Sequence, residues 1–392
     1  MRSLIFFLNC FYIVLVLLWE PLHNTIITFD SKGRTVVFLS IILFLLNLIS
    51  NKRFKRLLLS KPIVFWGIWI IYSSINLSIQ GYDHELPFLF YIIINLFAPF
   101  LIMLIVAFEW HYQPKKIIFM LLFTFVSYGL FTLLLIDEFA GLTAEQNVGK
   151  LGNMGPLNTM FVIFYASLLF AHKWLKKQTL LLSIAFTFLI IVLIATRKAF
   201  GAALIMLIFL ILSQVKLSFK SLALTIVLSL ITIGSVNLAL NNSTMGKRFE
   251  SIEESGMKFN TTDNEVLNLL GDRAFFYITG TEIFLENPIT GIGLNNFTNK
   301  SGTNYRIHSE YIVQITEGGI IGCLFFLLFY LSISRKLYQI WKTNRNTRTL
   351  TFVLIGGFSA ILFVNITAWT YEFPHYFACF GVIIGYLKIN KQ

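Results

Sequence analysis

Residues 86–108 read LPFLFYIIINLFAPFLIMLIVAF, a run in which no side chain carries a charge. A helix needs about 20 apolar residues to cross the hydrocarbon core of a bilayer, so this segment alone can span a membrane. Similar runs repeat along the 392-residue chain, which is 56% hydrophobic and only 13% charged. A soluble domain usually carries about twice that charged fraction, which excludes a soluble enzyme, a disulfide scaffold and a disordered chain.

Apolar segments predict twelve transmembrane helices. Lipid offers no water to satisfy backbone polar groups, and the segments do not alternate in polarity as barrel strands do, so we predict helices throughout. The sequence thus predicts an all-α polytopic membrane protein, with helices one to nine in residues 1–240, a large loop in 241–307 and helices ten to twelve in 308–392. The predicted segments are 4–19, 34–50, 62–79, 86–108, 117–136, 156–172, 179–196, 199–213, 220–240, 309–333, 350–367 and 373–387.

The distribution of charge predicts the orientation. Cytoplasmic loops of membrane proteins carry an excess of Lys and Arg. With the N-terminus placed in the cytoplasm, 20 of the 31 basic residues fall inside, and 18 of the 19 acidic residues fall outside or near the outer face. The net charge of +12 then divides into +19 inside and −7 outside, so it indicates topology rather than a surface for nucleic acid. We expect both termini in the cytoplasm and no cleavable signal peptide.

The cysteines do not suggest chemistry. Cys10, Cys323 and Cys379 all fall within predicted helices. A thiol there usually behaves as a small hydrophobic side chain. The sequence therefore offers neither a disulfide framework nor a metal site.

The outer loop holds the first candidate residues. Within it, residues 272–286 are predicted to form an amphipathic helix that Pro288 ends, because the residue before proline disfavours the helical region. Arg273 opens this helix, where its guanidinium and the backbone N–H groups could together bind a phosphate; an ion pair with a nearby carboxylate is the alternative. Gly291 and Gly293 then predict a tight turn that brings two backbones close, not a dinucleotide-binding fingerprint.

Two further candidates lie at the outer ends of predicted helices. Arg197 falls between two apolar runs, so it could present its guanidinium to an anion beneath the headgroups. An ordinary turn with a snorkelling cation would explain the same position. Asn158 belongs to the glycine- and amide-rich stretch 149–159, which could line the mouth of a ligand site or form a plain loop.

His308 opens the predicted tenth helix. A histidine can accept a proton near neutral pH, although a lone histidine at a helix start is more often a satisfied interfacial side chain. Glu310, Gln314 and Glu317 follow at spacings of four and three residues, so they share one helical face. Two acids on one face of a membrane helix predict a polar cavity rather than contact with lipid.

Taken together, these residues resemble the O-antigen ligase and polymerase family of bacterial envelope enzymes. The stretch Gly152–Asn158 is similar to that family's glycine, proline and asparagine motif before a transmembrane helix, and Arg197 is similar to its arginine between two helices. The run from Arg273 to Gly293 resembles its arginine, amphipathic helix, proline and Gly-x-Gly turn. The resemblance covers about residues 140–335 in the family's order.

The resemblance continues at His308. This residue leads into residues 317–322, EGGIIG, which are similar to the family's Glu-x-Gly-x-x-Gly pattern in a transmembrane helix. Two positions depart from the pattern. Ser309 follows the histidine where the family often has asparagine, and Lys198 follows Arg197 where the family has a small residue. These departures concern the expected contacts to the acceptor rather than the fold.

The resemblance implies a GT-C-like membrane glycosyltransferase that works, without metal or cofactor, at the periplasmic face of the bacterial inner membrane. Donor and acceptor would be glycans linked to undecaprenyl diphosphate, and a chain-length regulator would be a protein partner. Arg197 and Arg273 would bind the diphosphate and stabilise the charge of the leaving group. His308 would orient or deprotonate the acceptor hydroxyl, which attacks the anomeric carbon with inversion. The other expected substrate-binding residues are Gly291, Gly293, Glu310 and Asn158.

Three activities remain open from the sequence. A polymerase would move the growing chain onto a new lipid-linked repeat unit, whereas a ligase would move the finished chain onto lipid A core. Only 14 residues separate Gly293 from His308, and ligases often carry a longer, more basic insertion there, which favours a polymerase. A flippase for lipid-linked sugars would also suit twelve helices. Transporters, however, tend to keep functional polar groups near the midplane, and the candidates here cluster at the outer edge.

Overall fold

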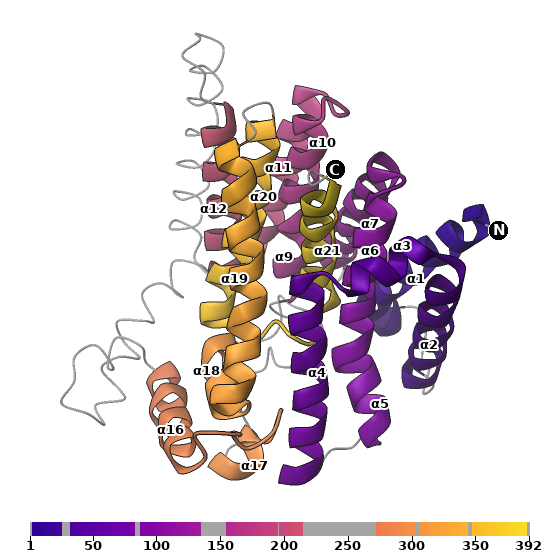
Figure 1. Ribbon diagram of the computed structural model, residues 1–392. Coiled ribbons are helices and arrows are strands. Elements are labelled where there is room, and N and C mark those ends of the chain that lie inside the picture. Colours follow the sequence, from indigo (N-terminus) through magenta and orange to yellow (C-terminus); the bar gives the residue numbers. More distant parts are fainter. Residues whose placement is uncertain are drawn as a thin grey trace.

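The structure is a computed structural model that describes residues 2–25, 32–82, 87–134, 154–194, 196–214, 272–302, 306–343 and 347–389. Every regular element in these residues is a helix (Figure 1). The helices before residue 215 are α1 (Arg2–Thr25), α2 (Lys32–Ser50), α3 (Lys52–Leu58), α4 (Lys61–Gln80), α5 (Phe88–Ile92), the π-helical turn η1 (Ile93–Phe97), α6 (Ala98–Trp110), α7 (Pro114–Leu134), α9 (Met154–Thr159), α10 (Phe161–Ala171), α11 (Lys177–Leu193) and α12 (Arg197–Gln214). The later helices are α16 (Asp272–Glu286), α17 (Phe297–Ser301), α18 (Glu310–Thr316), α19 (Gly319–Thr343), α20 (Arg348–Thr367) and α21 (Pro374–Ile389).

Several of these helices have the length and composition of membrane spans. Among the described residues, seven helices qualify, or eight if α2 and α3, which meet at a bend of 113°, form one span. The apolar helices 155–171 and α11 are shorter. The chain is therefore a multi-pass membrane protein. The predicted segment 220–240 lies outside the described residues, so a total of twelve spans and the division into three regions stay predictions.

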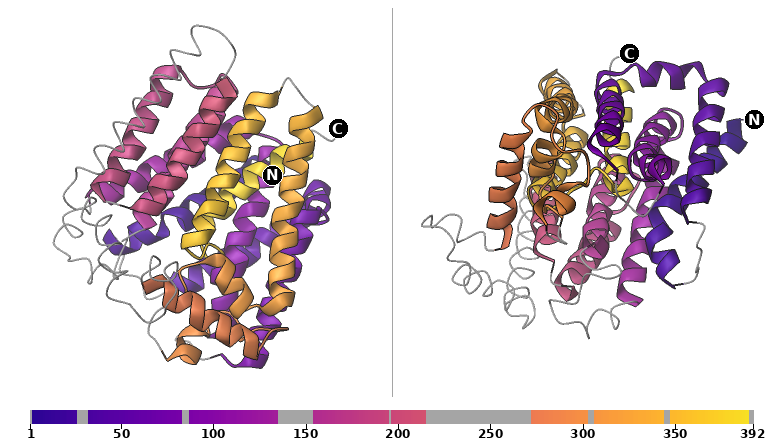
Figure 2. Two further views of the ribbon diagram at one scale, coloured as in Figure 1. Left: turned by 90° about the vertical axis from the view of Figure 1, so that its left-hand side faces the viewer. Right: turned by 90° about the horizontal axis from the view of Figure 1, so that it is seen from below.

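The core is built by helices that lie far apart in the sequence. α6 is buried along its whole length and packs against α21. Gly385 of α21 allows this contact, since a Cβ there would lie 2.8 Å from Trp110. α12 packs along α20 and α4 along α19; the left-hand view of Figure 2 shows the first of these pairs. The end of the chain thus fills the centre of the molecule.

One buried ion pair ties the first helix to the end of α6. The guanidinium of Arg2 donates to the carboxylate of Glu109 at 2.9 Å, and Asn9 donates to the same carboxylate at 2.7 Å. Glu109 is completely buried, so removing its partner would leave a buried polar group without compensation. The contact brings together two residues that the charge pattern assigns to the same side of the membrane.

The prediction of one helix over 309–333 is wrong. α18 ends at Thr316, the chain reverses at residues 317–319, and α19 begins at Gly319. The rings of Tyr311 and Phe326 lie only 6.2 Å apart. In a straight helix, 15 residues would separate them by about 22 Å. α18 therefore folds back along the first half of α19, and the membrane-length helix is α19 rather than 309–333.

The physical reason for this reversal is the backbone of Gly319. Its φ is +63°, a left-handed conformation that a residue with a Cβ avoids. Gly319 therefore turns the chain at this point. As a result, His308 precedes a short separate helix rather than opening a span. α16 and α17 lie at the end of the molecule where α19 begins (Figure 1).

Candidate active site

α16 (Asp272–Glu286) has the predicted bounds and positions the candidate residues of the outer loop. Its apolar side chains Phe276 and Ile283 are buried, and the helix packs against α18. The contact is close at Gly280, whose carbonyl accepts a hydrogen bond from the Thr316 hydroxyl at 2.9 Å. The helix that begins next to Arg273 therefore lies beside the helix that follows His308.

The glycines of the predicted turn lie against the α18–α19 reversal. Backbone hydrogen bonds join segment 288–293 to residues 316–321, and the N–H of Gly293 donates to the carbonyl of Glu317 at 2.9 Å. Gly291 has φ +68°, and a Cβ there would lie 2.5 Å from the carbonyl carbon of Glu317. The expected close approach of two backbones is thus present, and it joins two parts of the protein. A contact of Gly291 and Gly293 with substrate stays a prediction.

α4 holds segment 288–293 from a second direction. The side-chain amide of Asn76 donates to the carbonyl of Thr290 at 2.7 Å, and the Tyr72 hydroxyl donates to the carbonyl of Gly318 at 2.8 Å. Buried carbonyls need such partners, because an unpaired one loses its hydration without compensation. The outer end of α4, the α18–α19 reversal and segment 288–293 therefore form one connected unit.

The carboxylate of Glu317 organises the chain that follows this turn. It accepts the backbone N–H of Asn295 at 2.7 Å and that of Phe297 at 3.3 Å. Asn295 has φ +63°, so this part of the chain adopts a conformation that local preference does not favour. Glu317 stabilises it by pairing two buried N–H groups with a single side chain.

Replacing Glu317 by glutamine should destabilise this turn. One acceptor oxygen becomes an amide N–H that faces a backbone N–H, which leaves a buried donor unpaired. We expect a loss of about 1–3 kcal/mol in the free energy of unfolding, measured by thermal unfolding of the purified protein in detergent. Glu286→Gln, at an exposed acid of α16, is the control and should change stability by less than about 0.5 kcal/mol. Equal unfolding of both variants would contradict this role of Glu317.

Glu310 and Gln314 do share one face of α18, but the predicted polar cavity on that face is wrong. The carboxylate of Glu310 is fully buried and accepts hydrogen bonds from Gln314 at 2.7 Å, from the backbone of Tyr371 at 3.2 Å and from that of Thr370. Gln314 in turn accepts the indole N–H of Trp69 at 2.7 Å. Glu310 thus holds the α20–α21 loop in place, and Gln314 contacts α4. Protein groups occupy the hydrogen-bonding positions that water would occupy in a cavity. A contact of Glu310 with substrate stays a prediction.

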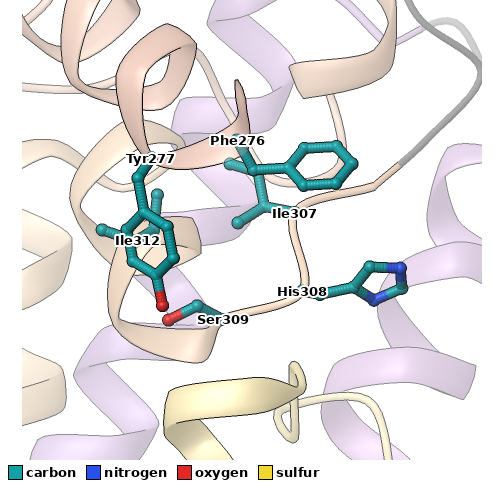
Figure 3. Close-up of a pocket in the computed structure, with 6 residues that line it drawn as sticks. All are labelled: Phe276, Tyr277, Ile307, His308, Ser309 and Ile312. Carbon is teal, nitrogen blue, oxygen red and sulfur yellow. The ribbon is translucent and has the colours of Figure 1, made fainter. Parts of the chain in front are cut away.

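His308 lies between two aromatic rings. Its imidazole stacks on Trp369, with ring centroids 5.3 Å apart and planes inclined by 22°, and meets Phe276 edge-on at 5.8 Å. His308 also lines a small apolar pocket with residues of α16 and α18 (Figure 3). Figure 3 shows the hydroxyls of Tyr277 and Ser309 turned toward each other and the imidazole pointing away from them. The ring is half-buried, so its orientation is fixed while part of it stays accessible.

The histidine is linked through its stacking partner to a group of four residues that the sequence does not single out, namely Trp369, Arg306, Glu372 and Tyr91. The guanidinium of Arg306 lies 5.7 Å from the ring centroid of Trp369, the ring on which His308 stacks. Arg306 also pairs with Glu372 at 2.9 Å, and Tyr91 donates to that carboxylate at 3.2 Å. The contacts join residues from three distant parts of the chain, so spacing could not reveal them. The only local signal is the run WTYEF at 369–373, which interrupts two apolar segments with polar groups.

Arg197 and Arg273 occupy equivalent positions on different helices. Arg197 is the first residue of α12, and Arg273 is the second residue of α16. The first turn of a helix exposes N–H groups and a positive dipole end, which favour an anion. Asn158 lies in α9, which contacts the neighbouring helices α11 and α12. Its side chain is buried, and its Nδ2 makes no hydrogen bond to a residue that the structure describes.

α20 (Arg348–Thr367) contacts both helices that begin with a candidate arginine. α12 packs along it so closely that a Cβ at Gly201 would lie 2.6 Å from the ring of Phe363. Three residues further along α20, the hydroxyl of Tyr277 in α16 donates to the carbonyl of Ile366 at 3.3 Å. The structure thus brings Arg273's helix next to the His308 segment, whereas Arg197 and Asn158 belong to a second group that α20 links to the first.

Comparison with known proteins agrees with the resemblance. No curated protein matches the chain. Residues 181–327 match the family model described as O-antigen ligase. This stretch includes every candidate residue except Asn158, and it includes both helix starts that carry an arginine. The matched part of the chain is therefore similar to the O-antigen ligase family, in agreement with the resemblance that the sequence motifs carry.

Proposed function

We propose that the protein is an O-antigen polymerase. It transfers a growing glycan from undecaprenyl diphosphate to a hydroxyl group of a lipid-linked repeat unit. The observation that supports this most is the set of positions inside the family match: an arginine in the first turn of α12, another in the first turn of α16, and a histidine held beside α16. A diphosphate leaving group needs cations, and an acceptor hydroxyl needs a base.

Arg197 and Arg273 bind the diphosphate in this proposal. A guanidinium forms paired, charge-assisted hydrogen bonds to phosphate oxygens, and it stays charged in any environment. Each arginine adds to the N-terminal dipole of its own helix. Negative charge increases on the diphosphate as the glycosidic bond breaks, so these groups stabilise the transition state more than the bound donor.

His308 accepts the proton of the acceptor in this proposal. The hydroxyl oxygen forms a bond to the anomeric carbon, the bond from that carbon to the diphosphate oxygen breaks, and the proton moves to the imidazole. Attack opposite the leaving group inverts the configuration. The stack on Trp369 fixes the plane of the ring, which lowers the cost of orienting a general base. No metal enters these steps.

The short connection between Gly293 and His308 favours a polymerase over a ligase. Where the structure describes it, this connection forms the small helix α17, and its apolar side chains Leu294, Phe297 and Ile307 are buried. It therefore supplies packing rather than a basic insertion for a phosphorylated core acceptor. The ligase remains the second candidate, because the matching family model is described as O-antigen ligase.

Orientation and partners belong to the same proposal. The charge pattern supports an inner-membrane protein with both termini in the cytoplasm, so that α16, α17 and the His308 segment face the periplasm. Donor and acceptor would reach this face from the membrane on undecaprenyl diphosphate. A chain-length regulator is a proposed protein partner, and a GT-C-like architecture is the proposed fold relationship.

A deletion of the gene in its own bacterium should distinguish polymerisation from ligation. If the protein is the polymerase, lipopolysaccharide carrying a single repeat unit should still accumulate, because ligation of one unit does not require chain growth. Gel electrophoresis of the lipopolysaccharide would then show core plus one unit and no ladder. Unsubstituted core alone would mean that ligation was lost, which would replace the polymerase by the ligase.

A further inference from the structure

A basic pocket lies at the other end of the molecule from the His308 segment, where α3, the end of α6 and the end of α21 meet. It is partly open to the surface of the molecule. Its polar lining consists of Arg53, Arg56, His111 and Lys388, and its floor includes the apolar side chains of Leu57 and Phe108. The pocket takes no part in the proposed transfer reaction, so its chemistry calls for a separate explanation.

The bend between α2 and α3 creates one wall of this pocket. The two helices meet at 113°, and the side chain of Asn51 caps α3 by accepting the N–H of Arg53 at 3.0 Å. Phe54 and Leu57 bury the inner face of α3. Arg53 and Arg56, three residues apart, are exposed on the same helix face. α3 therefore lies across the bundle end with two guanidiniums beside the pocket.

Carboxylates of the described residues do not pair with the cations of the pocket. Within the described part of the chain, Arg53, Arg56 and Lys388 form no ion pair with a carboxylate. The nearby carboxylate of Glu109 is buried and is already paired with Arg2. Among the described residues, the lining of the pocket thus combines several positive charges with no carboxylate of its own.

His111 lies close to the positive charges of the pocket. Its Nε2 lies 2.9 Å from Nη1 of Arg53, so a neutral imidazole accepts a hydrogen bond from the guanidinium. Burial, followed by the positive charges of Arg53 and Lys388, lowers the pKa of His111. A protonated His111 would add a further repelling charge. An anion in the pocket would remove this repulsion.

We propose that this pocket binds the phosphate group of an anionic phospholipid. Guanidinium, ammonium and imidazole groups that converge from three elements suit a phosphate, and basic pockets between membrane helices on the cytoplasmic side commonly bind such headgroups. The apolar surroundings favour a lipid over a free phosphate: Leu57 and Phe108 line the pocket, and Leu59, at the end of α3, is 79% exposed. An exposed leucine beside a cluster of cations fits the boundary between headgroups and acyl chains.

Native mass spectrometry of the purified protein in detergent tests this proposal. The probes are phosphatidylglycerol, phosphatidylcholine and inorganic phosphate. We expect phosphatidylglycerol to bind more tightly than phosphatidylcholine, and Arg53→Gln/Arg56→Gln to weaken its binding by at least about tenfold. Lys388→Gln removes one cation from another helix and should reduce the affinity for phosphatidylglycerol by a smaller factor. This variant tests the proposal if the double variant does not fold.

The matched control is Lys176→Gln/Lys177→Gln, which removes two exposed positive charges predicted on the same side of the membrane. This control should bind phosphatidylglycerol as the unmodified protein does. Three results would overturn the proposal: equal binding of the two lipids, equal loss in the control and the pocket variant, or binding of inorganic phosphate strong enough to displace the lipid. The last result would assign the pocket to a soluble phosphate instead.

Discussion

Replacing His308 by alanine should reduce chain extension by about 10²–10⁴-fold, the usual contribution of a general base. The variant should still insert into the membrane and fold. His308 makes ring contacts with Phe276 and Trp369, whereas backbone hydrogen bonds join segment 288–293 to the α18–α19 reversal. The loss should therefore appear in the rate of transfer rather than in the amount of folded protein.

The measurement uses purified protein with labelled lipid-linked repeat units, and it follows chain length on gels. EDTA should leave the activity of the unmodified protein intact, because the proposed reaction needs no metal. The matched control is His172→Ala. His172 also stacks on a tryptophan, Trp174, with ring centroids 4.3 Å apart, but it lies at the end of α10 that is predicted to be cytoplasmic. Only the His308 variant should lose activity.

Near-normal chain length in His308→Ala would exclude His308 as the base. Transport of the lipid-linked units without formation of glycosidic bonds would exclude the transferase itself and favour a flippase. A loss of activity in EDTA would contradict the metal-free reaction. Arg273→Ala in the same assay should resemble His308→Ala, since binding and departure of the diphosphate depend on it in the proposed mechanism.

Replacing Gly291 by alanine should destabilise the folded protein by about 3 kcal/mol or more. A left-handed conformation costs a residue with a Cβ about 1–2 kcal/mol, and the φ of Gly291 is +68°. The added Cβ would also lie 2.5 Å from the carbonyl carbon of Glu317 and 2.6 Å from the nitrogen of Gly319. These are backbone atoms, so no side chain can move away, and overpacking of this kind costs about 1–3 kcal/mol more.

Gly302→Ala separates the two contributions. Gly302 also has φ +68°, but no atom lies within 4 Å of the position its Cβ would take. This control therefore measures only the cost of the left-handed backbone. Thermal unfolding in detergent, followed by the fraction of protein that remains monodisperse, should rank the variants as unmodified, Gly302→Ala and Gly291→Ala. Similar behaviour of the two alanine variants would show that segment 288–293 does not lie tightly against Glu317.

The local features of this fold follow from the sequence. The bounds of α16 follow from its amphipathic pattern and from Pro288, and α12 begins at Arg197, where the charged pair interrupts the apolar run. In both cases a chemical signal within a few residues decides where the helix starts or ends. Helix starts and proline positions depend on local backbone sterics and hydrogen bonding, so they can be predicted.

The contacts between distant segments do not follow from the sequence. The stretch EGGIIG at 317–322 is compatible with a continuous helix, and only the tertiary contact with Gly291 shows that Gly319 turns the chain. The face shared by Glu310 and Gln314 suggests a cavity until the backbone of Thr370 is placed against it. Arg306 and Glu372 pair across 66 positions. Each of these features depends on a contact with a segment that is distant in the sequence. The spacing of residues along one helix does not reveal such a contact.

The burial of α6 has a consequence for biosynthesis. α6 is complete once Trp110 has emerged from the ribosome, but the helix that covers it, α21, begins only at Pro374. Until then, the surface of α6 that receives Gly385 must be shielded by lipid or by the insertion machinery. The arrival of α21 therefore decides whether the centre of the molecule closes. A nascent chain that stops before it would present an unfinished interior to the proteases that survey the membrane.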